Sequence, residues 1–358
     1  MKRKIFISLF FYFTFFNLHA SEIKFEKVIH GLNNPWSLSF IDKEKIIFTE
    51  KSGKLYTLNL QNKKISKINH NLNVKDYGQG GLLDVLYNDR NVYISYSENR
   101  GDRTTSTSVA KGIFNQNSIK FNNIFRADPP IDSMYHFGSR LVIKSKHLYI
   151  TAGERGKGMI AQDPTNHIGT IIRIHLDGSI PKGNPKFEGN SNWLPEIYQI
   201  GVRNPQGMSI DPLTQQVYIS NHGPKGGDFI GPVIKGTNYG WKQVAWGGTN
   251  YSGTKVGNGN AWEPGLLKPD HIWVPSIGVG GIKFYQGNIF PEWNNSLLVA
   301  SLKLRYLSVL PRIDNGFGKE EIIFKDKIGR IRDIEINQKG EIFLIADEYE
   351  TFLYKLLP

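Results

Sequence analysis

The chain has 358 residues, no cysteine and a formal net charge of +12 at pH 7. A disulfide framework is therefore excluded, and a chain of this length has to be stabilised by a large hydrophobic core. Its basic residues are scattered rather than gathered in an arm or stripe. This distribution argues against nucleic acid as a partner and leaves an acidic protein partner open.

Residues 1–20 have the composition of a secretory signal peptide. Three basic residues follow Met1, residues 5–16 are predominantly apolar, and Leu18-His19-Ala20 resembles a small-residue cleavage site. The apolar run is too short to span a bilayer comfortably. We therefore expect cleavage near Ala20, a periplasmic or secreted mature chain of residues 21–358, and no stable membrane insertion.

From residue 35 onward, one β-pattern recurs six times: an apolar run, a turn, and a second run that mixes apolar, aromatic and hydroxyl residues. The first runs of the six copies are residues 35–40, 81–86, 139–143, 206–210, 281–285 and 331–336. The second runs are residues 46–50, 92–96, 148–152, 217–220, 297–301 and 342–346. A β-unit that repeats in this way is typical of a radial array.

The predicted fold is all-β: one six-bladed β-propeller with four-stranded antiparallel blades, covering residues 21–358. A β-sandwich or two stacked barrels are the alternatives, but paired runs separated by large, variable insertions favour the propeller. Residues 22–28 could complete the last blade, so that the ring closes without open sheet edges. The insertions at 99–132, 156–169 and 223–270 are expected to be long loops that carry function.

Polar residues recur next to the predicted inner strands, where the blades of a propeller converge on its axis. They are Gln79, His136, Glu154, Arg203, Asn204, Gly223, Pro224, Lys303, Arg330 and Arg332. Each alone reads as a solvated loop residue, but the set contains four cations, which would repel one another without an anion between them. The predicted ligand therefore carries several carboxylates or phosphates, which arginine binds in bidentate fashion.

Short motifs follow one another along the whole mature chain. They are His136-Phe137-Gly138-Ser139-Arg140-Leu141, Gly153-Glu154-Arg155, Ala161-Gln162-Asp163, Leu176-Asp177-Gly178-Ser179-Ile180-Pro181, Arg203-Asn204-Pro205-Gln206-Gly207, His222-Gly223-Pro224 with Gly226-Gly227-Asp228, and Asn238-Tyr239-Gly240-Trp241. Together they resemble the soluble quinoprotein sugar dehydrogenases, the glucose/sorbosone and aldose sugar dehydrogenases that use pyrroloquinoline quinone (PQQ). The resemblance implies a six-bladed propeller, a tricarboxylate cofactor and oxidation of aldoses at the anomeric carbon to lactones.

The same resemblance implies roles for the candidate residues. PQQ would be held by Gln79, Arg203, Asn204, Lys303, Arg330 and Arg332. The main-chain carbonyls of Gly223 and Pro224 would bind Ca²⁺, which acts as a Lewis acid on the quinone oxygen. His136 would be the general base that takes the substrate's hydroxyl proton as hydride passes to the C5 carbonyl of the quinone, and Glu154 would orient it. An external acceptor, a cytochrome or a quinone, would then remove the electrons.

One position departs from the family pattern, and two other functions stay open. Asp228 is followed by Phe229, where the family often has Asp-Glu, so we expect no second calcium ion. A metal-dependent propeller lactonase or hydrolase would need several converging carboxylates and amides, whereas the predicted axis is cationic. A non-catalytic binding propeller would dock an acidic partner and take up no cofactor.

Overall fold

The computed structural model describes residues 23–187, 192–314 and 316–358. The predicted signal peptide, residues 1–20, lies outside the described residues. Within the described residues, no helix combines the length and apolar character that a membrane crossing requires.

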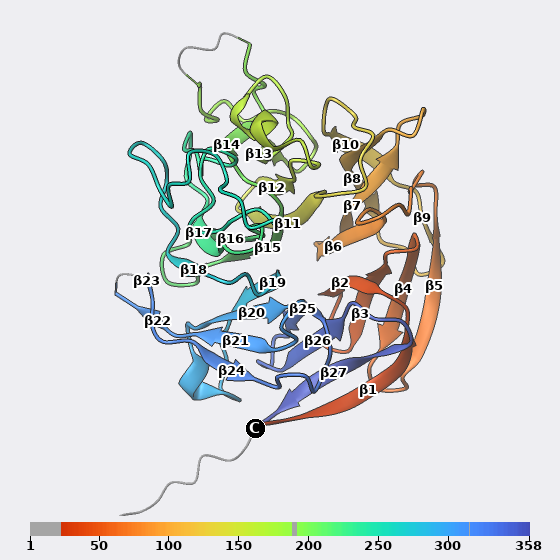
Figure 1. Cartoon of the computed structure of the whole chain (residues 1–358). Coiled ribbons are helices and arrows are strands. Elements are labelled where there is room, and N and C mark those ends of the chain that lie inside the picture. The colour runs from red at the N-terminus through yellow and green to blue at the C-terminus, as the bar shows by residue number, and fades with distance from the viewer. Residues whose placement is uncertain (1–22, 188–191, 315) are drawn as a thin grey trace, which may run out of the picture.

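Six antiparallel sheets are arranged radially around one axis (Figure 1). The innermost strands are β2 (Pro35–Phe40), β6 (Leu82–Asn88), β11 (Gly138–Lys144), β15 (Pro205–Ile210), β19 (Val279–Phe284) and β25 (Ile331–Ile336). The second strands are β3 (Lys45–Glu50), β7 (Asn91–Asn99), β12 (His147–Ala152), β16 (Val217–Asn221), β20 (Leu297–Ser301) and β26 (Ile342–Ala346). The third strands are β4 (Lys54–Asn59), β8 (Thr105–Ile113), β13 (Thr170–His175), β17 (Asp228–Pro232), β21 (Leu307–Leu310) and β27 (Thr351–Leu357).

The outer strands complete the blades, and the predicted six-bladed propeller is confirmed. They are β5 (Lys64–His70), β10 (Asn122–Arg126), β14 (Ile197–Ile200), β18 (His271–Trp273), β24 (Glu321–Ile323) and β1 (Lys24–Leu32). The short strand β9 (Ser118–Ile119) adds a fifth, parallel member to the first blade by pairing with β5. The remaining elements are a small hairpin, β22 (Arg312–Ile313) and β23 (Gly316–Phe317), and two 3₁₀ turns, η1 (Gly158–Gln162) and η2 (Pro291–Trp293).

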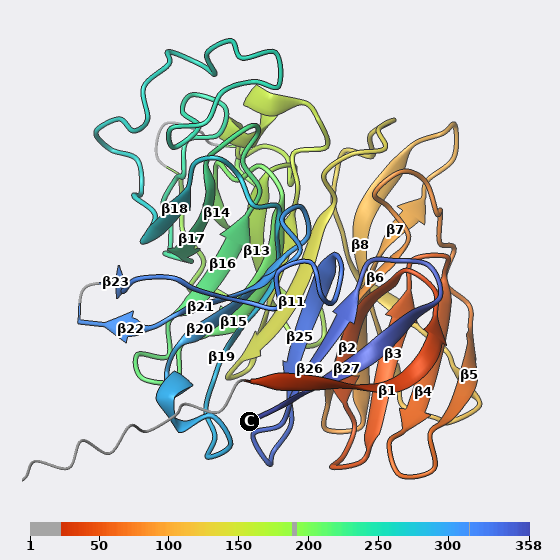
Figure 2. The same cartoon turned by 60° about the horizontal axis from the view of Figure 1, so that its bottom comes forward.

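The two ends of the propeller domain close the ring within one blade. Strand β1 pairs antiparallel with β27, from Lys24 opposite Leu357 to Leu32 opposite Thr351. Both views show these strands side by side (Figures 1 and 2). The predicted pairing of this N-terminal segment with the last blade is confirmed, and it leaves that blade without an open third strand.

The hydrophobic core lies between neighbouring blades. Ile47 and Leu55 of the first blade, for example, belong to one buried cluster with Leu82 and Ile94 of the second. Because a blade is covered on both faces, its second strand is an apolar run rather than a strict alternation, as in β20 and β26. This packing makes the ring a rigid frame for the loops at the ends of its strands.

The prediction that residues 99–132 and 223–270 form loops is wrong in part, because β8, β10 and β17 lie within them. Strand β8 is rich in hydroxyl residues and yet mostly buried. Two of its hydroxyl groups donate to neighbouring segments: Thr107 Oγ1 to the carbonyl of Phe137 at 2.6 Å, and Ser108 Oγ to Glu98 Oε2 at 2.7 Å. The sequence of this strand looks polar and exposed. The partners that make its burial favourable cannot be recognised from the strand itself, because some of them lie far along the chain.

Charged side chains meet on the propeller axis at the third residue of the inner strands. These third residues are Ser37, Asp84, Arg140, Gly207, Gly281 and Asp333. Every inner strand has an irregular register with its neighbour at this level. Such bulges turn side chains away from the regular alternation of a strand, here toward the axis.

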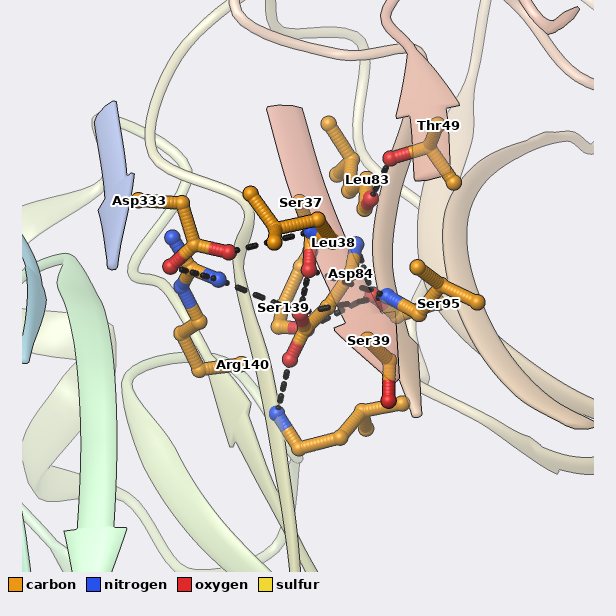
Figure 3. Close-up of polar contacts among 12 residues, drawn as sticks. Ser37, Leu38, Ser39, Thr49, Leu83, Asp84, Ser95, Ser139, Arg140 and Asp333 are labelled. Carbon is orange, nitrogen blue, oxygen red and sulfur yellow. Dashed lines mark hydrogen bonds and ion pairs between the residues drawn. The ribbon is translucent and has the colours of Figure 1, made fainter. Parts of the chain in front are cut away.

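Arg140 ties several blades together at this level (Figure 3). Its Nη1 lies 3.1 Å from Asp84 Oδ1 and 2.9 Å from Asp333 Oδ1. Its Nε donates to the carbonyl of Gln206 at 2.6 Å, and its Nη2 to the carbonyl of Arg332 at 3.3 Å. One buried guanidinium from β11 therefore contacts β6, β15 and β25 at once.

The two carboxylates extend this cluster to the first blade, and glycine makes room for it. Ser37 Oγ donates to Asp84 Oδ1 at 2.5 Å, and the backbone N–H of Leu38 donates to Asp333 Oδ2 at 3.2 Å. A Cβ at Gly281 would stand 2.3 Å from Asp333 Oδ1. We call Asp84, Arg140 and Asp333 the axial cluster.

Arg140→Met is expected to lower the free energy of unfolding by about 3–5 kcal/mol, because it leaves two buried carboxylates without a cation. Urea unfolding of the purified protein measures this loss. Arg103→Met is the matched control, since the Arg103 side chain is 84% exposed in its pair with Asp132. In the control, the free energy of unfolding should fall by no more than about 1 kcal/mol. Equal, small losses of unfolding free energy in both variants would contradict the role of the axial cluster.

Candidate functional site

A cavity of about 310 Å³ opens beside the axial cluster, and it collects the predicted cofactor and metal residues. Its lining includes Gln79, His136, Arg203, Asn204, Gly223, Pro224, Lys303, Arg330 and Arg332. Glu154 lies next door, in a chamber of about 150 Å³ that shares His136, Arg203 and Pro224 with the cavity. The structure therefore brings together all of the residues that the sequence singled out.

The blades supply these residues from two kinds of connection. Gln79, His136 and Arg203 precede the inner strands β6, β11 and β15, whereas Lys303 follows the second strand β20. Both kinds of connection lie at the same end of an antiparallel propeller blade, because an inner strand begins where its neighbour ends. Arg332 differs in that it lies within β25 itself.

The cavity lining has an excess of positive charge. It contains five cationic side chains and two carboxylates, an excess of three positive charges among the lining residues. The cations are Lys51, Arg203, Lys303, Arg330 and Arg332, and the carboxylates are Asp228 and Asp347. Lys51 also lies 3.7 Å from the exposed Asp76, a pair that solvent screens. An anion of several charges fits such a lining.

The two carboxylates are already engaged. Asp347 lies 2.9 Å from Arg332 Nη2 and 3.6 Å from Arg330 Nη2. Burial acts to raise the pKa of Asp347, but these arginines outweigh it and lower the pKa to about 2. Asp228 accepts hydrogen bonds from the backbone N–H groups of Gly223 at 2.8 Å and Gly278 at 2.6 Å. Neither carboxylate is therefore available to cancel a further cation.

Two arginines of the cavity are held with only part of their hydrogen-bonding capacity used. Arg332 Nη1 donates to Gln206 Oε1 at 2.7 Å, while its buried Nε has no partner among the described residues. The Arg203 guanidinium lies 5.3 Å from the centroid of the Trp241 ring, and its Nη1 donates to a backbone carbonyl at 3.4 Å. Burial lowers the pKa of both groups. Both would gain from an anionic acceptor in the cavity.

His136 and Glu154 form a hydrogen-bonded pair at the edge of the cavity. The contact joins His136 Nδ1 to Glu154 Oε1, and Glu154 Oε2 accepts the backbone N–H of Gly158. Burial acts to raise the pKa of Glu154, but His136, the N–H of Gly158 and the charge of Arg203 together outweigh it, so that the pKa lies below its usual value. Burial lowers the pKa of His136, and Glu154 offsets this only in part. A neutral imidazole therefore faces a carboxylate near pH 7, with its proton on Nδ1 and a lone pair on Nε2.

The backbone of His136 is in the left-handed region, with φ of +51°. This conformation costs a residue other than glycine about 1–3 kcal/mol, and surrounding contacts have to hold it. The His136 N–H donates to Gln79 Oε1 at 2.8 Å. A Cβ at Gly153 would stand 2.1 Å from the carbonyl oxygen of His136, so only glycine permits this close approach.

Gly223 and Pro224 line the cavity, and each has a main-chain carbonyl oxygen. Within the described residues, neither oxygen accepts a hydrogen bond. Asp228 fixes this segment through the N–H of Gly223, as described above. Backbone carbonyls are suitable ligands for a hard cation such as Ca²⁺. The described part of the chain has no group of three or more His, Asp or Glu that could hold a metal, so a cation here would depend on carbonyls and on the bound ligand.

Sequence reasoning missed several groups of the site. Lys51, Gln206 and Asp347 line the cavity, and the axial cluster forms its support. The signal for Asp347 was its place just after the second strand β26, in the same kind of connection that carries Lys303 after β20. The signal for Asp84 was a charge among the apolar residues of β6, whereas Asp333 shares β25 with Arg332 and Glu335 and gave no such signal.

Comparison with known proteins assigns the chain to a family. A profile of the glucose/sorbosone dehydrogenase family matches residues 32–355. The chain belongs to this family. Among its relatives is the aldose sugar dehydrogenase YliI of Escherichia coli, which is 33% identical over 338 residues that cover 91% of each chain. Quinoprotein glucose dehydrogenase B of Acinetobacter calcoaceticus is 29% identical over 92% of this chain and 86% of its own length.

Solved structures agree with this assignment. The soluble aldose sugar dehydrogenase of Escherichia coli, in its apo form, superimposes with a TM-score of 0.89 at 32% identity, over 94% of this chain and 99% of that one. The resemblance seen in the sequence motifs is thereby confirmed. The motifs with the cavity residues Arg203, Asn204, Gly223 and Pro224 fall within the matched range.

Glu154→Gln is expected to lower the pKa of His136 further, because it removes the carboxylate that offsets the effect of burial. The measurement is an NMR pH titration of labelled histidine side chains, with His136 assigned through a His136→Asn variant. The wild-type midpoint should lie below the usual value of about 6.5. Asp132→Asn, which removes a carboxylate paired with Arg103, is the control and should leave the midpoint in place. A midpoint that rises in Glu154→Gln would contradict the proposed pairing.

Proposed function

We propose that this protein is a PQQ- and Ca²⁺-dependent dehydrogenase that oxidises aldose sugars at the anomeric carbon to lactones. The observation that carries the proposal is the cavity's excess of three positive charges directly beside His136. PQQ carries three carboxylates, so its charge complements that lining. The family assignment and a relative named a quinoprotein glucose dehydrogenase support the same conclusion.

The residues present fit PQQ chemically. Its carboxylates would pair with Arg203, Lys303, Arg330 and Arg332, whose own acceptors are incomplete, as the unpartnered Nε of Arg332 illustrates. The amides of Gln79 and Asn204 would add hydrogen bonds. Asn204 Oδ1 already accepts from the N–H of Gly138 at 3.0 Å, which leaves its amide nitrogen for the cavity. The carbonyls of Gly223 and Pro224 would hold Ca²⁺ next to the cofactor.

His136 would act as the general base. When bound, PQQ would supply the two-electron acceptor for the hydride of the anomeric carbon. The lone pair on His136 Nε2 would take the proton of the anomeric hydroxyl group, so that the C–O bond can become a carbonyl as hydride departs. Glu154 would hold the Nδ1 proton and stabilise the imidazolium cation that results. Burial of His136 keeps its pKa low enough for the neutral base to be present near pH 7.

The two alternative functions are less well supported by this cavity. A lactonase or hydrolase with a central metal needs converging carboxylates, whereas both cavity carboxylates are engaged with arginine or backbone donors. A purely binding propeller gives no reason for a buried histidine–carboxylate pair at the cavity edge. We further propose that residues 21–358 are the mature enzyme, exported to the periplasm or secreted, and that an external cytochrome or quinone accepts its electrons.

Reconstitution tests the proposal directly. Absorbance titration of the purified protein with PQQ in the presence of Ca²⁺ should show stoichiometric binding, and dye reduction should follow with some member of an aldose panel. His136→Asn should retain PQQ binding and lose about 10²–10⁴-fold in kcat, because it removes the base. Asparagine is chosen because it tolerates the left-handed backbone. His175→Ala, at a half-exposed ring far along β13, serves as the control. PQQ binding without turnover of any sugar would overturn the substrate assignment.

Calcium dependence is a separate expectation. Prolonged dialysis against EGTA should abolish turnover, and added Ca²⁺ should restore it more fully than Mg²⁺. The reason is that Mg²⁺ demands a tighter octahedral shell than two carbonyls on one turn readily provide. Metal analysis of the dialysed sample accompanies the assay. Full activity in a sample shown to be free of calcium would rule out the Gly223–Pro224 site.

A further inference from the structure

We propose that Arg155 is a positioning residue, which clamps the segment of residues 133–137 so that His136 points at the substrate. The inference rests on the proposed role of His136 as the base. Arg155 follows Glu154 directly, yet its side chain takes no part in the chemistry described above. Its contacts run instead to both sides of His136 in sequence.

The guanidinium of Arg155 binds the residues that flank His136. Its Nε donates to the carbonyl of Tyr135 at 2.9 Å, and its Nη2 donates to the carbonyl of Ser133 at 2.5 Å. On the other side of His136, the centre of the guanidinium lies 3.7 Å from the centroid of the Phe137 ring. The backbone N–H of Arg155 also donates to the carbonyl of His136 at 3.3 Å.

The other edge of the guanidinium is anchored in the frame of the second blade. Arg155 Nη1 donates to the carbonyl of Thr105 at 2.9 Å, and Nη2 donates to Thr105 Oγ1 at 2.8 Å. Thr105 is fully buried and begins β8. One planar side chain therefore fastens the segment that carries the base to a strand of the rigid ring. Only arginine presents donors in a fork that can reach these acceptors together while stacking on a ring.

The charge of Arg155 is unusual for its surroundings. The side chain is only 1% exposed, and among the described residues it forms no ion pair with a carboxylate. A cation buried in this way costs free energy unless its hydrogen bonds are complete, and here the partners are all carbonyl or hydroxyl oxygens. Burial lowers the pKa of Arg155 to about 9, which still leaves it protonated at neutral pH.

That charge also acts on the base. Glu154 raises the pKa of His136, whereas the positive charges of Arg203 and Arg155 lower it. Removing the charge of Arg155 should therefore raise the pKa of His136. Since only the neutral imidazole accepts a proton, the acidic limb of the pH–rate profile should move to higher pH. A residue that merely filled space would leave this limb unchanged.

The test uses two substitutions at this position in the full-length holoenzyme. Arg155→Met removes both the fork and the charge, and should lower kcat by about 10–100-fold through misplacement of the base. The KM for the sugar should change little, and the acidic limb should shift to higher pH. Arg155→Lys keeps the charge without the fork, so it should keep the wild-type limb and recover part of kcat. Arg173→Met is the matched control, since Arg173 also stacks on a ring, that of Tyr198 at 4.7 Å, away from the cavity.

A second readout does not depend on turnover. Hydrogen exchange of the amides at residues 133–137, measured in the protein without added PQQ, should speed up in Arg155→Met and stay at the wild-type rate in Arg173→Met. If wild-type protein binds PQQ but turns over no sugar, the proposed function is wrong. The exchange rates at residues 133–137 still test whether Arg155 holds this segment in place. If wild type is active and Arg155→Met matches it in kcat, pH profile and exchange, the inference is wrong.

Thr105→Val covers the case in which Arg155→Met does not fold. It removes the hydroxyl acceptor of Arg155 Nη2 and leaves a residue well suited to a strand. We expect a smaller fall in kcat, an unchanged acidic limb and faster exchange at residues 133–137. Unchanged kcat together with unchanged exchange would overturn the clamp.

Discussion

The ion pairs of Arg140 with Asp84 and Asp333 are the constraint on which the rest of the structure depends. Burial alone would lower the pKa of Arg140, but the two carboxylates outweigh burial and raise it. The cluster is therefore stable only while three blades keep their positions, because any displacement would leave a charge buried without its partner. The same guanidinium donates to the carbonyls of Gln206 and Arg332. Because both residues line the cavity, the axial cluster also fixes this part of the cavity wall.

The axial cluster and the cavity beside it use arginine in opposite ways. At Arg140 the charge is compensated within the protein, and its pKa is raised. At Arg203 and Arg332 burial is not fully offset, and their pKa values are lowered. The cavity thus holds cations in an electrostatically unfavourable state that a multiply charged anion would relieve. Such preorganised charge lowers the stability of the folded protein without ligand. It also makes the binding of an anion more favourable.

Much of this arrangement could be read from the sequence, since a pair of β-runs, the second of them largely apolar, recurs in each blade. The polar residues beside these strands could be placed on one axis without a structure, because a propeller superimposes equivalent positions of its blades. Two things could not be read. The burial of β8 depends on acceptors in another segment, such as the carbonyl of Phe137. Whether Asp84 is solvated or paired depends on Arg140, and no local pattern encodes that distance.

At His136, orientation and protonation are controlled by different neighbours. Glu154 orients His136 but, taken alone, would raise its pKa and keep it protonated. Burial and the positive charges of Arg203 and Arg155 act in the other direction, and the net effect is a lowered pKa. The protein can therefore hold the imidazole firmly with a carboxylate and still keep it neutral near pH 7. A single partner would couple the orientation of His136 to its pKa, whereas here separate groups control the two. One of these groups, Arg155, is bound to Thr105 in the ring of blades that the axial cluster keeps rigid.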